Sequence, residues 1–134
     1  MAHVLETGFE ILDRENPNGS PTVMGYNVIN GELRSASDGE TFESRNPAWL
    51  DDCLGVFPLS TKKDVNDALI SAREAFSQWS QTPAPTRGQI IGNMGRLLME
   101  HKDDIVRVES REIGKTLKES AGEVQEAIDT CLFF

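Results

Sequence analysis

Hydrophobic spacing changes character once along this chain. Up to about residue 59 the apolar residues form short runs separated by turn-forming residues, and from Ser60 onward they recur at steps of three and four. Short alternating runs are typical of strands, whereas steps of three and four place apolar residues on one face of a helix. The pattern therefore predicts an α+β arrangement, in which a small β-meander over residues 27–59 precedes three amphipathic helices.

The strands are predicted from turn signals and from alternation. Asn30-Gly31 stands between apolar residues and is the strongest short signal for a hairpin. Residues 41–45 alternate like a half-buried strand, and residues 55–59 form a third extended piece. Residues 1–26 contain several Gly, Asn and Pro without a sustained period, so we expect an irregular N-terminal arm there.

Capping signals indicate where the helices begin and end. Thr61 and Asp64 have the spacing of a capping box, which opens the first helix. Thr86 and Gln89 have the same spacing and predict the start of a second helix, which Gly114 ends as a left-handed C-cap. The apolar stripe of this second helix consists of Ile91, Met94, Leu98, His101, Ile105 and Val108.

A third helix is predicted from Leu117 to Leu132. No Gly, Asn or Pro follows its apolar stripe before Phe134, so the helical pattern carries no stop signal. We therefore expect the 134 residues to be part of a longer polypeptide.

Composition narrows the classes of partner. The chain has 13 Lys and Arg against 22 Asp and Glu, a formal net charge of −9, which argues against binding to nucleic-acid phosphates or anionic membranes. No run approaches the roughly 18 apolar residues of a membrane span, and residues 1–6 do not resemble a secretory signal. These features predict a cytoplasmic protein that binds neither nucleic acid nor membrane.

Gly114-Lys115-Thr116 invites comparison with a phosphate-binding loop. That loop requires a further Gly five residues before Gly114, and this position is Glu109, whose carboxylate would repel phosphate. A helix C-cap followed by a cation that complements the helix dipole is the better interpretation.

Nucleophile and metal patterns are weak. Cys53 follows two Asp residues and Cys131 lies within an apolar stripe, and both settings disfavour a thiolate. His101 has Asp103 and Asp104 nearby, but adjacent acids on a helix cannot both face one ion. The residues by themselves indicate no active site.

Several short motifs, taken in order, resemble the start of the aldehyde dehydrogenase superfamily. Their order and spacing carry the resemblance from about residue 27 to residue 134, with a slight likeness to the aminoadipic-semialdehyde branch. The motifs are Ile29-Asn30-Gly31-Glu32, Thr41 to Ala48, Val56 to Thr61, Asp64-Val65 with Ala72 to Trp79, Arg87-Gly88, Glu112 to Lys115, and Gly122 to Glu126.

The resemblance implies NAD(P)-dependent oxidation of an aldehyde to a carboxylic acid. In that family a Cys thiolate adds to the carbonyl, hydride passes to the nicotinamide, and a Glu-activated water releases the acyl group. The family fold is α/β with a Rossmann-like cofactor domain, and residues 27–134 would be the incomplete N-terminal part of that domain. Its catalytic and nucleotide-binding groups come later in the family, so we expect the chain alone to be inactive and to bind neither NAD nor NADP tightly.

The resemblance also implies a homo-oligomer for the full-length protein and one further site. A structural monovalent cation would be held by the backbone carbonyls of Ser44 and Arg45 and by the side chain of Glu112. Oxygen ligands suit such an ion. The alternative is that Glu112 pairs with a neighbouring Lys or Arg.

Two other classes of protein stay open. A truncated relative without enzymatic activity would act as an interaction module, because uncovered apolar helix faces commonly mark contact surfaces. An independent metal-dependent enzyme would use His101, Asp103 and Asp104.

Overall fold

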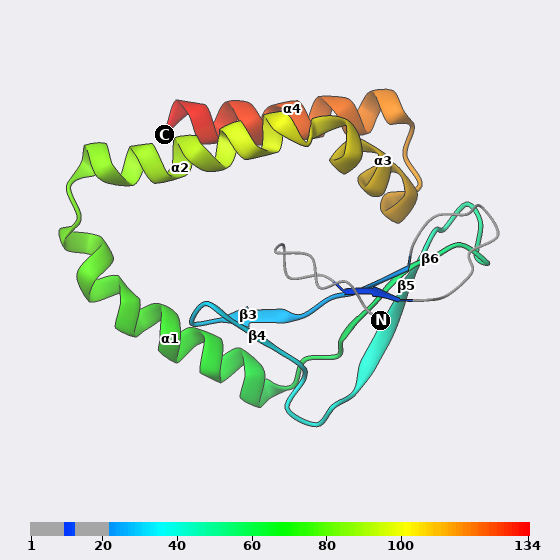
Figure 1. Cartoon of the computed structure of the whole chain (residues 1–134), viewed down its shortest axis with the longest axis horizontal. Coiled ribbons are helices and arrows are strands. Elements are labelled where there is room, and N and C mark those ends of the chain that lie inside the picture. Colours follow the sequence, from blue (N-terminus) through cyan, green and yellow to red (C-terminus); the bar gives the residue numbers. More distant parts are fainter. Residues whose placement is uncertain (1–9, 13–21) are drawn as a thin grey trace. The chain divides into compact units, whose positions relative to one another are not determined.

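The computed structural model describes residues 10–12 and 22–134, in which short strands precede the helices (Figure 1). The chain divides into two compact units, an N-terminal unit of residues 1–77 and a C-terminal unit of residues 78–134. The predicted α+β class of this stretch is confirmed.

Strand pairing in the N-terminal unit differs from a meander. The described strands are β1 (Glu10–Leu12), β2 (Thr22–Met24), β3 (Asn27–Ile29), β4 (Glu32–Arg34), β5 (Thr41–Arg45) and β6 (Cys53–Pro58). β3 and β4 form a separate hairpin, and the other four make one sheet in the order β1-β2-β6-β5. β2 and β6 are parallel neighbours, whereas β1–β2 and β5–β6 are antiparallel. The predicted meander over residues 27–59 is therefore wrong, because the consecutive strands β4 and β5 belong to different sheets and do not pair.

The predicted hairpin is confirmed at Asn30-Gly31. Val28 lies opposite Leu33 in the antiparallel register of β3 and β4. Asn30 and Gly31 have φ values of 55° and 74°, the left-handed conformations that a two-residue hairpin turn needs. Asn and Gly tolerate these angles better than other residues, which is why the turn could be found from sequence.

β6 is the buried strand of the larger sheet. Its first four residues are buried, and Phe57 lies opposite Phe42 of β5 with ring centroids 5.9 Å apart. The buried Thr22 hydroxyl of β2 donates a hydrogen bond to the carbonyl of Cys53 at 3.3 Å. Side-chain and ladder contacts thus join β6 to the strands on both sides.

Two strands fall within the predicted irregular arm. β1 and β2 occupy residues 10–12 and 22–24, so the expectation of irregular structure is wrong there. Residues 1–9 and 13–21, the rest of that prediction apart from residues 25 and 26, lie outside the described residues. β2 is recruited by its pairing with β6, which a local pattern cannot indicate.

Four helices replace the three that were predicted. They are α1 (Lys62–Gln81), α2 (Ala84–Glu100), α3 (Lys102–Ile113) and α4 (Leu117–Phe133). The predicted second helix is divided at His101, where φ is −105° and ψ is 15°. A single residue outside the helical region ends α2 and opens α3 while the apolar spacing continues, so the spacing did not reveal the break.

The capping predictions have mixed outcomes. Asp64 accepts a hydrogen bond from the Thr61 N–H at 2.7 Å, and Gly114 has a left-handed φ of 78°, so both of these caps are confirmed. The box at Thr86 and Gln89 is wrong, because α2 begins at Ala84, immediately after its N-cap residue Pro83. A Pro in the first helical turn needs no hydrogen-bond partner for its nitrogen, and this sets the earlier start.

α2 and α4 lie side by side in the C-terminal unit, with α3 packed against α4 (Figure 1). Val106, Val124 and Ile128 form its core, and Ile128 is fully buried. α2 approaches α4 closely at Gly95, where an added Cβ would lie 3.0 Å from the Cβ of Cys131. This close helix contact therefore requires a residue without a side chain at position 95.

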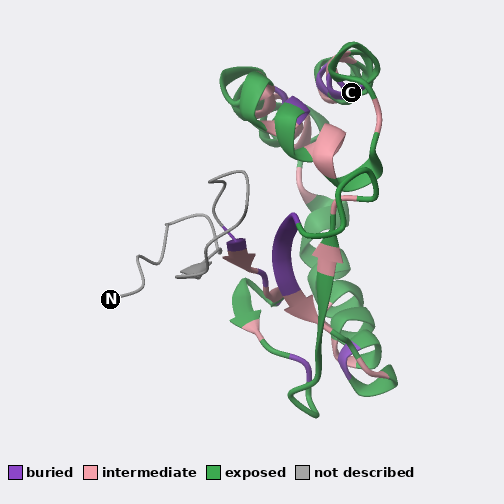
Figure 2. Cartoon of the chain, turned by 90° about the vertical axis from the view of Figure 1, so that its right-hand side faces the viewer, coloured by how far each residue is buried: buried purple, intermediate pink, exposed green. Residues whose placement is uncertain are grey.

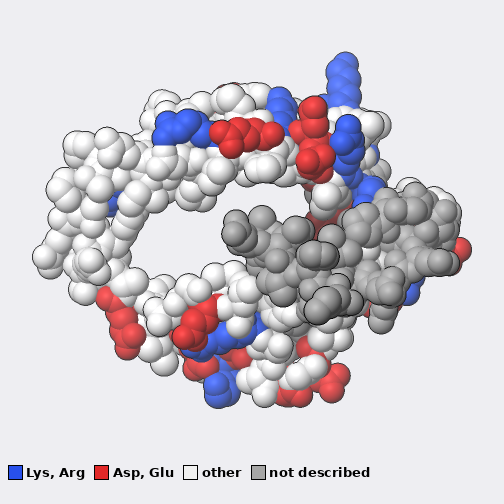
Figure 3. Space-filling model, viewed as in Figure 1, with Lys and Arg blue, Asp and Glu red and all other residues white. Residues whose placement is uncertain are grey.

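α1 leaves its apolar stripe uncovered in the described part of the chain. Val65, Leu69 and Phe76 are 54%, 63% and 64% exposed, and most of α1 is coloured as exposed in Figure 2. The surface at the C-terminal end of α1 is largely free of charge in the view of Figure 3. Within the described residues, no helix is both long and apolar enough to cross a membrane.

Replacing Gly95 with Ala tests the contact between α2 and α4. The new methyl group would meet a Cβ fixed to the facing helix, so we expect Gly95→Ala to lower the free energy of unfolding by about 1 kcal/mol or more. Gly92→Ala is the matched control, since nothing lies within 4 Å of its added Cβ. It should raise that free energy by about 0.5–1 kcal/mol through helix propensity. Urea unfolding followed by circular dichroism measures both, and equal effects would contradict the packing described.

Candidate functional site

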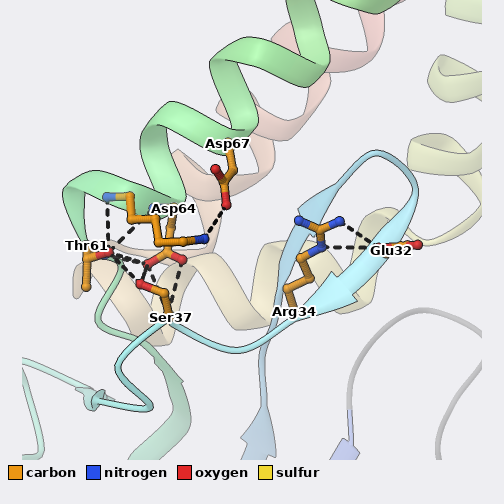
Figure 4. A network of polar contacts seen from close by, with 7 residues as sticks. Glu32, Arg34, Ser37, Thr61, Asp64 and Asp67 are labelled. Atoms are coloured by element: carbon orange, nitrogen blue, oxygen red, sulfur yellow. Dashed lines mark hydrogen bonds and ion pairs between the residues drawn. The ribbon is translucent and has the colours of Figure 1, made fainter.

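The most connected polar group of the N-terminal unit is the carboxylate of Asp64. It accepts hydrogen bonds from the backbone N–H groups of Ser37 at 3.1 Å and Thr61 at 2.7 Å (Figure 4). Its Oδ2 atom also lies 3.3 Å from the Ser37 hydroxyl and 2.9 Å from the Thr61 hydroxyl. Asp64 thereby joins the loop after β4 to the N-terminus of α1, which makes it a structural carboxylate.

These donors stabilise the ionised form of Asp64. The Thr61 N–H is the largest cause that lowers the pKa of this carboxyl to about 2, and the Ser37 N–H adds to it against the opposing effect of burial. A carboxylate held by so many donors is a poor general base. The Asp64 network positions α1 and offers no acid-base chemistry.

The segment 114–116, considered above as a phosphate loop, is fully used by the helices on either side. Gly114 caps α3, and the Thr116 side chain caps α4 in a capping box with Glu119. The Lys115 ammonium is paired with the Glu123 carboxylate. The Gly114 N–H, the Thr116 N–H and the Lys115 ammonium are thus engaged within the segment and its two helices, which agrees with its interpretation as a helix connection.

Neither cysteine is in a disulfide, and neither is placed as a nucleophile. Cys53 is buried in β6, and its Sγ lies 3.8 Å from the carbonyl of Gly55. Cys131 is half-buried on α4, facing Gly95 of α2. Arg45 of β5 lies opposite Cys53, but its guanidinium is engaged by the Glu43 carboxylate and the Leu50 carbonyl. Cys131 lies in the last turn of α4, away from a helix N-terminus.

His101, Asp103 and Asp104 do not form a metal site. His101 lies at the break between α2 and α3, and Asp104 pairs with Arg107 one turn further along α3 at 3.2 Å. Over residues 10–12 and 22–134, no three His, Cys, Asp or Glu side chains gather so that they could hold a metal ion. The class of an independent metal-dependent enzyme therefore gains no support.

The residues expected to hold a monovalent cation belong to different units. Ser44 and Arg45 lie at the end of β5, where the register against β6 shifts between them. Glu112 lies exposed in the last turn of α3. The Arg45 guanidinium is engaged by the Glu43 carboxylate and by the carbonyl of Leu50 at 2.8 Å. This ligand set stays a prediction.

A carboxyl pair in the C-terminal unit was not anticipated. Glu109 of α3 and Glu123 of α4 shift each other's pKa, and Glu123 also pairs with Lys115. The Glu123 carboxyl and then burial raise the pKa of Glu109, while Lys115 is the main cause that lowers the pKa of Glu123. Glu109 follows the half-buried Ile105 by four residues, a spacing that could have placed it on the packed side of α3.

Comparison with known proteins agrees with the fold. A betaine aldehyde dehydrogenase of Staphylococcus aureus, a double mutant in complex with NAD+, matches with a TM-score of 0.76 and 28% identity over 81% of this chain and 22% of its own. An NADP dependent enzyme of Escherichia coli matches with a TM-score of 0.76 and 34% identity over 80% of this chain and 22% of its own.

Curated relatives give the same result at the level of sequence. The α-ketoglutarate semialdehyde dehydrogenase of Haloferax volcanii is 38% identical over 108 residues, covering 81% of this chain and 22% of the relative. Malonate-semialdehyde dehydrogenase 1 of Geobacillus kaustophilus is 37% identical over 113 residues, covering 84% of this chain and 23% of the relative. The chain thus spans about a fifth of the length of these relatives and matches their N-terminal part.

A model of the aldehyde dehydrogenase family matches residues 34–134, three quarters of the sequence. The chain therefore belongs to the aldehyde dehydrogenase family, as the ordered motifs indicated. The slight likeness to the aminoadipic-semialdehyde branch stays a prediction.

A dinucleotide pyrophosphate is held by a Gly-rich turn that opens a helix, and the chain contains no GxGxxG. The one Gly-Lys-Thr segment is occupied by helix caps and by the Lys115–Glu123 ion pair.

The Asp64 network predicts a specific acid sensitivity. Because its pKa is lowered from an ordinary 3.8 to about 2, Asp64 adds stability above about pH 4 that is lost as the pH falls through 2. Asp64→Asn should remove this part of the acid transition and lower stability at pH 7. Asp67→Asn is the control, since it breaks only the exposed pair with Lys63. Unfolding midpoints measured from pH 2 to 7 check this, and identical profiles for the two variants would refute the role given to Asp64.

Proposed function

We propose that this chain serves as the N-terminal part of an NAD(P)-dependent aldehyde dehydrogenase that oxidises an aldehyde to a carboxylic acid through a Cys thiohemiacetal. The observation that carries the proposal is the family match over residues 34–134. Relatives and structural neighbours that bind NAD+ or depend on NADP support the cofactor class. The aldehyde is a small molecule.

The role of the chain within that enzyme is structural. The described residues contribute strands, helix caps and apolar faces to the fold. Residues 27–134 would form the incomplete N-terminal part of the cofactor-binding domain. We expect the 134-residue chain alone to turn over no aldehyde and to bind neither NAD nor NADP tightly.

The remaining properties follow from the same proposal. Two cysteines that form no disulfide are consistent with a reducing compartment, and we infer a cytoplasmic location. We also infer a homo-oligomer for the complete enzyme, and no nucleic-acid or membrane partner, in keeping with the net charge of −9.

A structural monovalent cation is a second part of the proposal. The carbonyls of Ser44 and Arg45 and the Glu112 side chain would supply its ligands. The shift of register between Ser44 and Arg45 supports this, because a ladder irregularity leaves backbone groups without their regular partners.

A chimaera tests the structural role. This chain would replace the matching segment of the Geobacillus kaustophilus malonate-semialdehyde dehydrogenase 1, which would supply the rest of the enzyme. We expect NADH formation from malonate semialdehyde within about tenfold of the host enzyme, a change of about 1.4 kcal/mol in the barrier. The isolated chain, given NAD+ or NADP+ and a panel of aldehydes, should produce no NADH.

A chimaera carrying Gly55→Val serves as the negative control. Even the first side-chain carbon at position 55 would lie 2.8 Å from the Val23 carbonyl oxygen, so this variant should lose the β2–β6 pairing and with it the activity. A chimaera that assembles like the host but forms no NADH would count against the proposal. So would robust NADH formation by the isolated chain.

The rival class, an interaction module without enzymatic activity, is favoured by the exposed stripe of α1. The chimaera distinguishes the two classes, because an interaction module that cannot replace the matching segment of the enzyme would leave the chimaera without activity.

Replacing K+ with N-methyl-D-glucamine tests the cation. In the chimaera this exchange, at constant ionic strength, should lower the melting temperature by a few degrees, because an ion that binds only the native state stabilises it. Glu112→Gln should abolish the difference between the two buffers, and Glu126→Gln, another exposed carboxylate, should keep it. Melting curves that are the same in both buffers for the unmodified chimaera would argue against the site.

A further inference from the structure

We propose that the outer edge of β3 receives an additional strand from the remaining part of the enzyme, and that this strand places an apolar side chain in the groove between β3 and α1. The inference rests on the proposed function, since the strand would come from the polypeptide that completes the enzyme. The site lies wholly within the N-terminal unit, where the β3–β4 hairpin lies beside the first half of α1 (Figure 1).

The outer edge of β3 has no strand beside it in the described part of the chain. β3 pairs only with β4, and Ile29 lies opposite Glu32 on either side of the two-residue turn. The residues that flank such a turn exchange the ladder hydrogen bonds, and the next pair directs its N–H and C=O groups outward. That next pair is Val28 and Leu33. No described residue outside the hairpin bonds to the backbone of Val28, so this edge can accept a strand.

A groove lies between β3 and the first turns of α1. Ile29, Ser60, Val65 and Ala68 are among its lining residues, and its volume is about 170 Å³. A single water needs only about 10–15 Å³, so the groove has room for a side chain. Ile29 is buried, whereas Val65 is 54% exposed. An apolar side chain in the groove would therefore remove more apolar surface of α1 from water.

A hydrogen-bond donor of the groove lacks an acceptor. The Asn27 Oδ1 atom accepts a hydrogen bond from the Ser60 hydroxyl at 3.0 Å, which fixes the orientation of the Asn27 amide. The Nδ2 atom of this amide is buried and meets no acceptor among the described residues. A buried donor without an acceptor is costly. A backbone carbonyl of the added strand would supply the acceptor that Asn27 lacks.

The charges of the hairpin favour the edge of β3 over the edge of β4. β4 carries Glu32 and Arg34, which form an ion pair at 2.7 Å (Figure 4). Charged side chains on an edge strand discourage pairing with a further strand. All three residues of β3 are uncharged. The added strand should therefore be uncharged and apolar where it lies against β3.

The size of the site favours an occupant from the same polypeptide. The edge of β3 is three residues long, far smaller than the roughly 1,200–2,000 Å² that specific interfaces between separate proteins bury. A second copy would also lose translational freedom on binding, whereas a tethered segment would lose much less. The chain matches 22% and 23% of the length of the two curated relatives, so most of such an enzyme lies outside this segment and is available to supply the strand.

Hydrogen–deuterium exchange of the Val28 amide tests the added strand. In the isolated 134-residue chain this amide should exchange as an exposed one does. In the chimaera with the Geobacillus kaustophilus enzyme it should exchange more slowly by about tenfold or more. The Leu33 amide, on the outer edge of β4, is the internal control and should exchange equally fast in both proteins. Mass spectrometry with fragmentation distinguishes the two amides. Equally fast exchange of Val28 in both proteins would overturn the proposal.

Proline at the same two positions gives a second readout. Val28→Pro removes the N–H offered to the added strand, and Leu33→Pro removes the corresponding N–H of β4. Neither N–H belongs to the ladder between β3 and β4, and Pro is tolerated at such edge positions. In the isolated chain the two variants should shift the melting temperature equally. In the chimaera Val28→Pro should lower it by a few degrees more than Leu33→Pro. Equal shifts in the chimaera would contradict the proposal, and if either variant does not fold, exchange in the unmodified proteins decides.

The measurements separate this inference from the proposed function. A chimaera that forms NADH while Val28 exchanges as in the isolated chain would overturn the inference alone. Protection of Val28 in a chimaera that forms no NADH would support the added strand and count against the proposed function. Protection already present in the isolated chain would overturn the inference, and a sedimentation mass of two copies would then assign the edge to a second copy.

Discussion

Coverage of apolar helix faces is the constraint on which the rest of this structure depends. α4 satisfies it within the C-terminal unit, where Val124 and Ile128 are buried against neighbouring helices and Gly95 lets α2 approach. α1 does not satisfy it, since the stripe from Val65 to Trp79 is largely exposed in the described residues. Because burial of apolar surface is the main favourable contribution to folding, a helix with such a stripe gains by packing against further protein surface. This is what the proposed place in a longer enzyme would supply.

Polar contacts set the geometry that apolar packing leaves open. Asp64 gathers donors from the loop after β4 and from the start of α1, so that a single ionised carboxylate fixes where this helix begins. Lys115, in the connection between α3 and α4, forms an ion pair with Glu123 of α4. The donors around Asp64 favour its ionised form. The roles of these polar groups can be recognised only when the structure shows which residues lie next to them.

Family membership and chemical capacity are separate properties of this chain. The match over residues 34–134 establishes the aldehyde dehydrogenase family, yet the Gly-Lys-Thr segment, both cysteines and His101 are occupied by structural tasks. Strands, caps and helix contacts are thus what these residues contribute to the fold. A chain that spans about a fifth of a relative's length is therefore assigned to the family by residues that serve the fold.

Local signals in the sequence determined the elements whose causes are local. Asn30-Gly31, the Thr61–Asp64 box and the Gly114 cap were predictable because each depends on the backbone preferences of a few adjacent residues. The parallel pairing of β2 with β6 and the break at His101 were decided by tertiary structure. The strand pairing joins residues distant in sequence, and the break depends on the backbone angles of one residue. Hydrophobic spacing along the chain indicates neither of them.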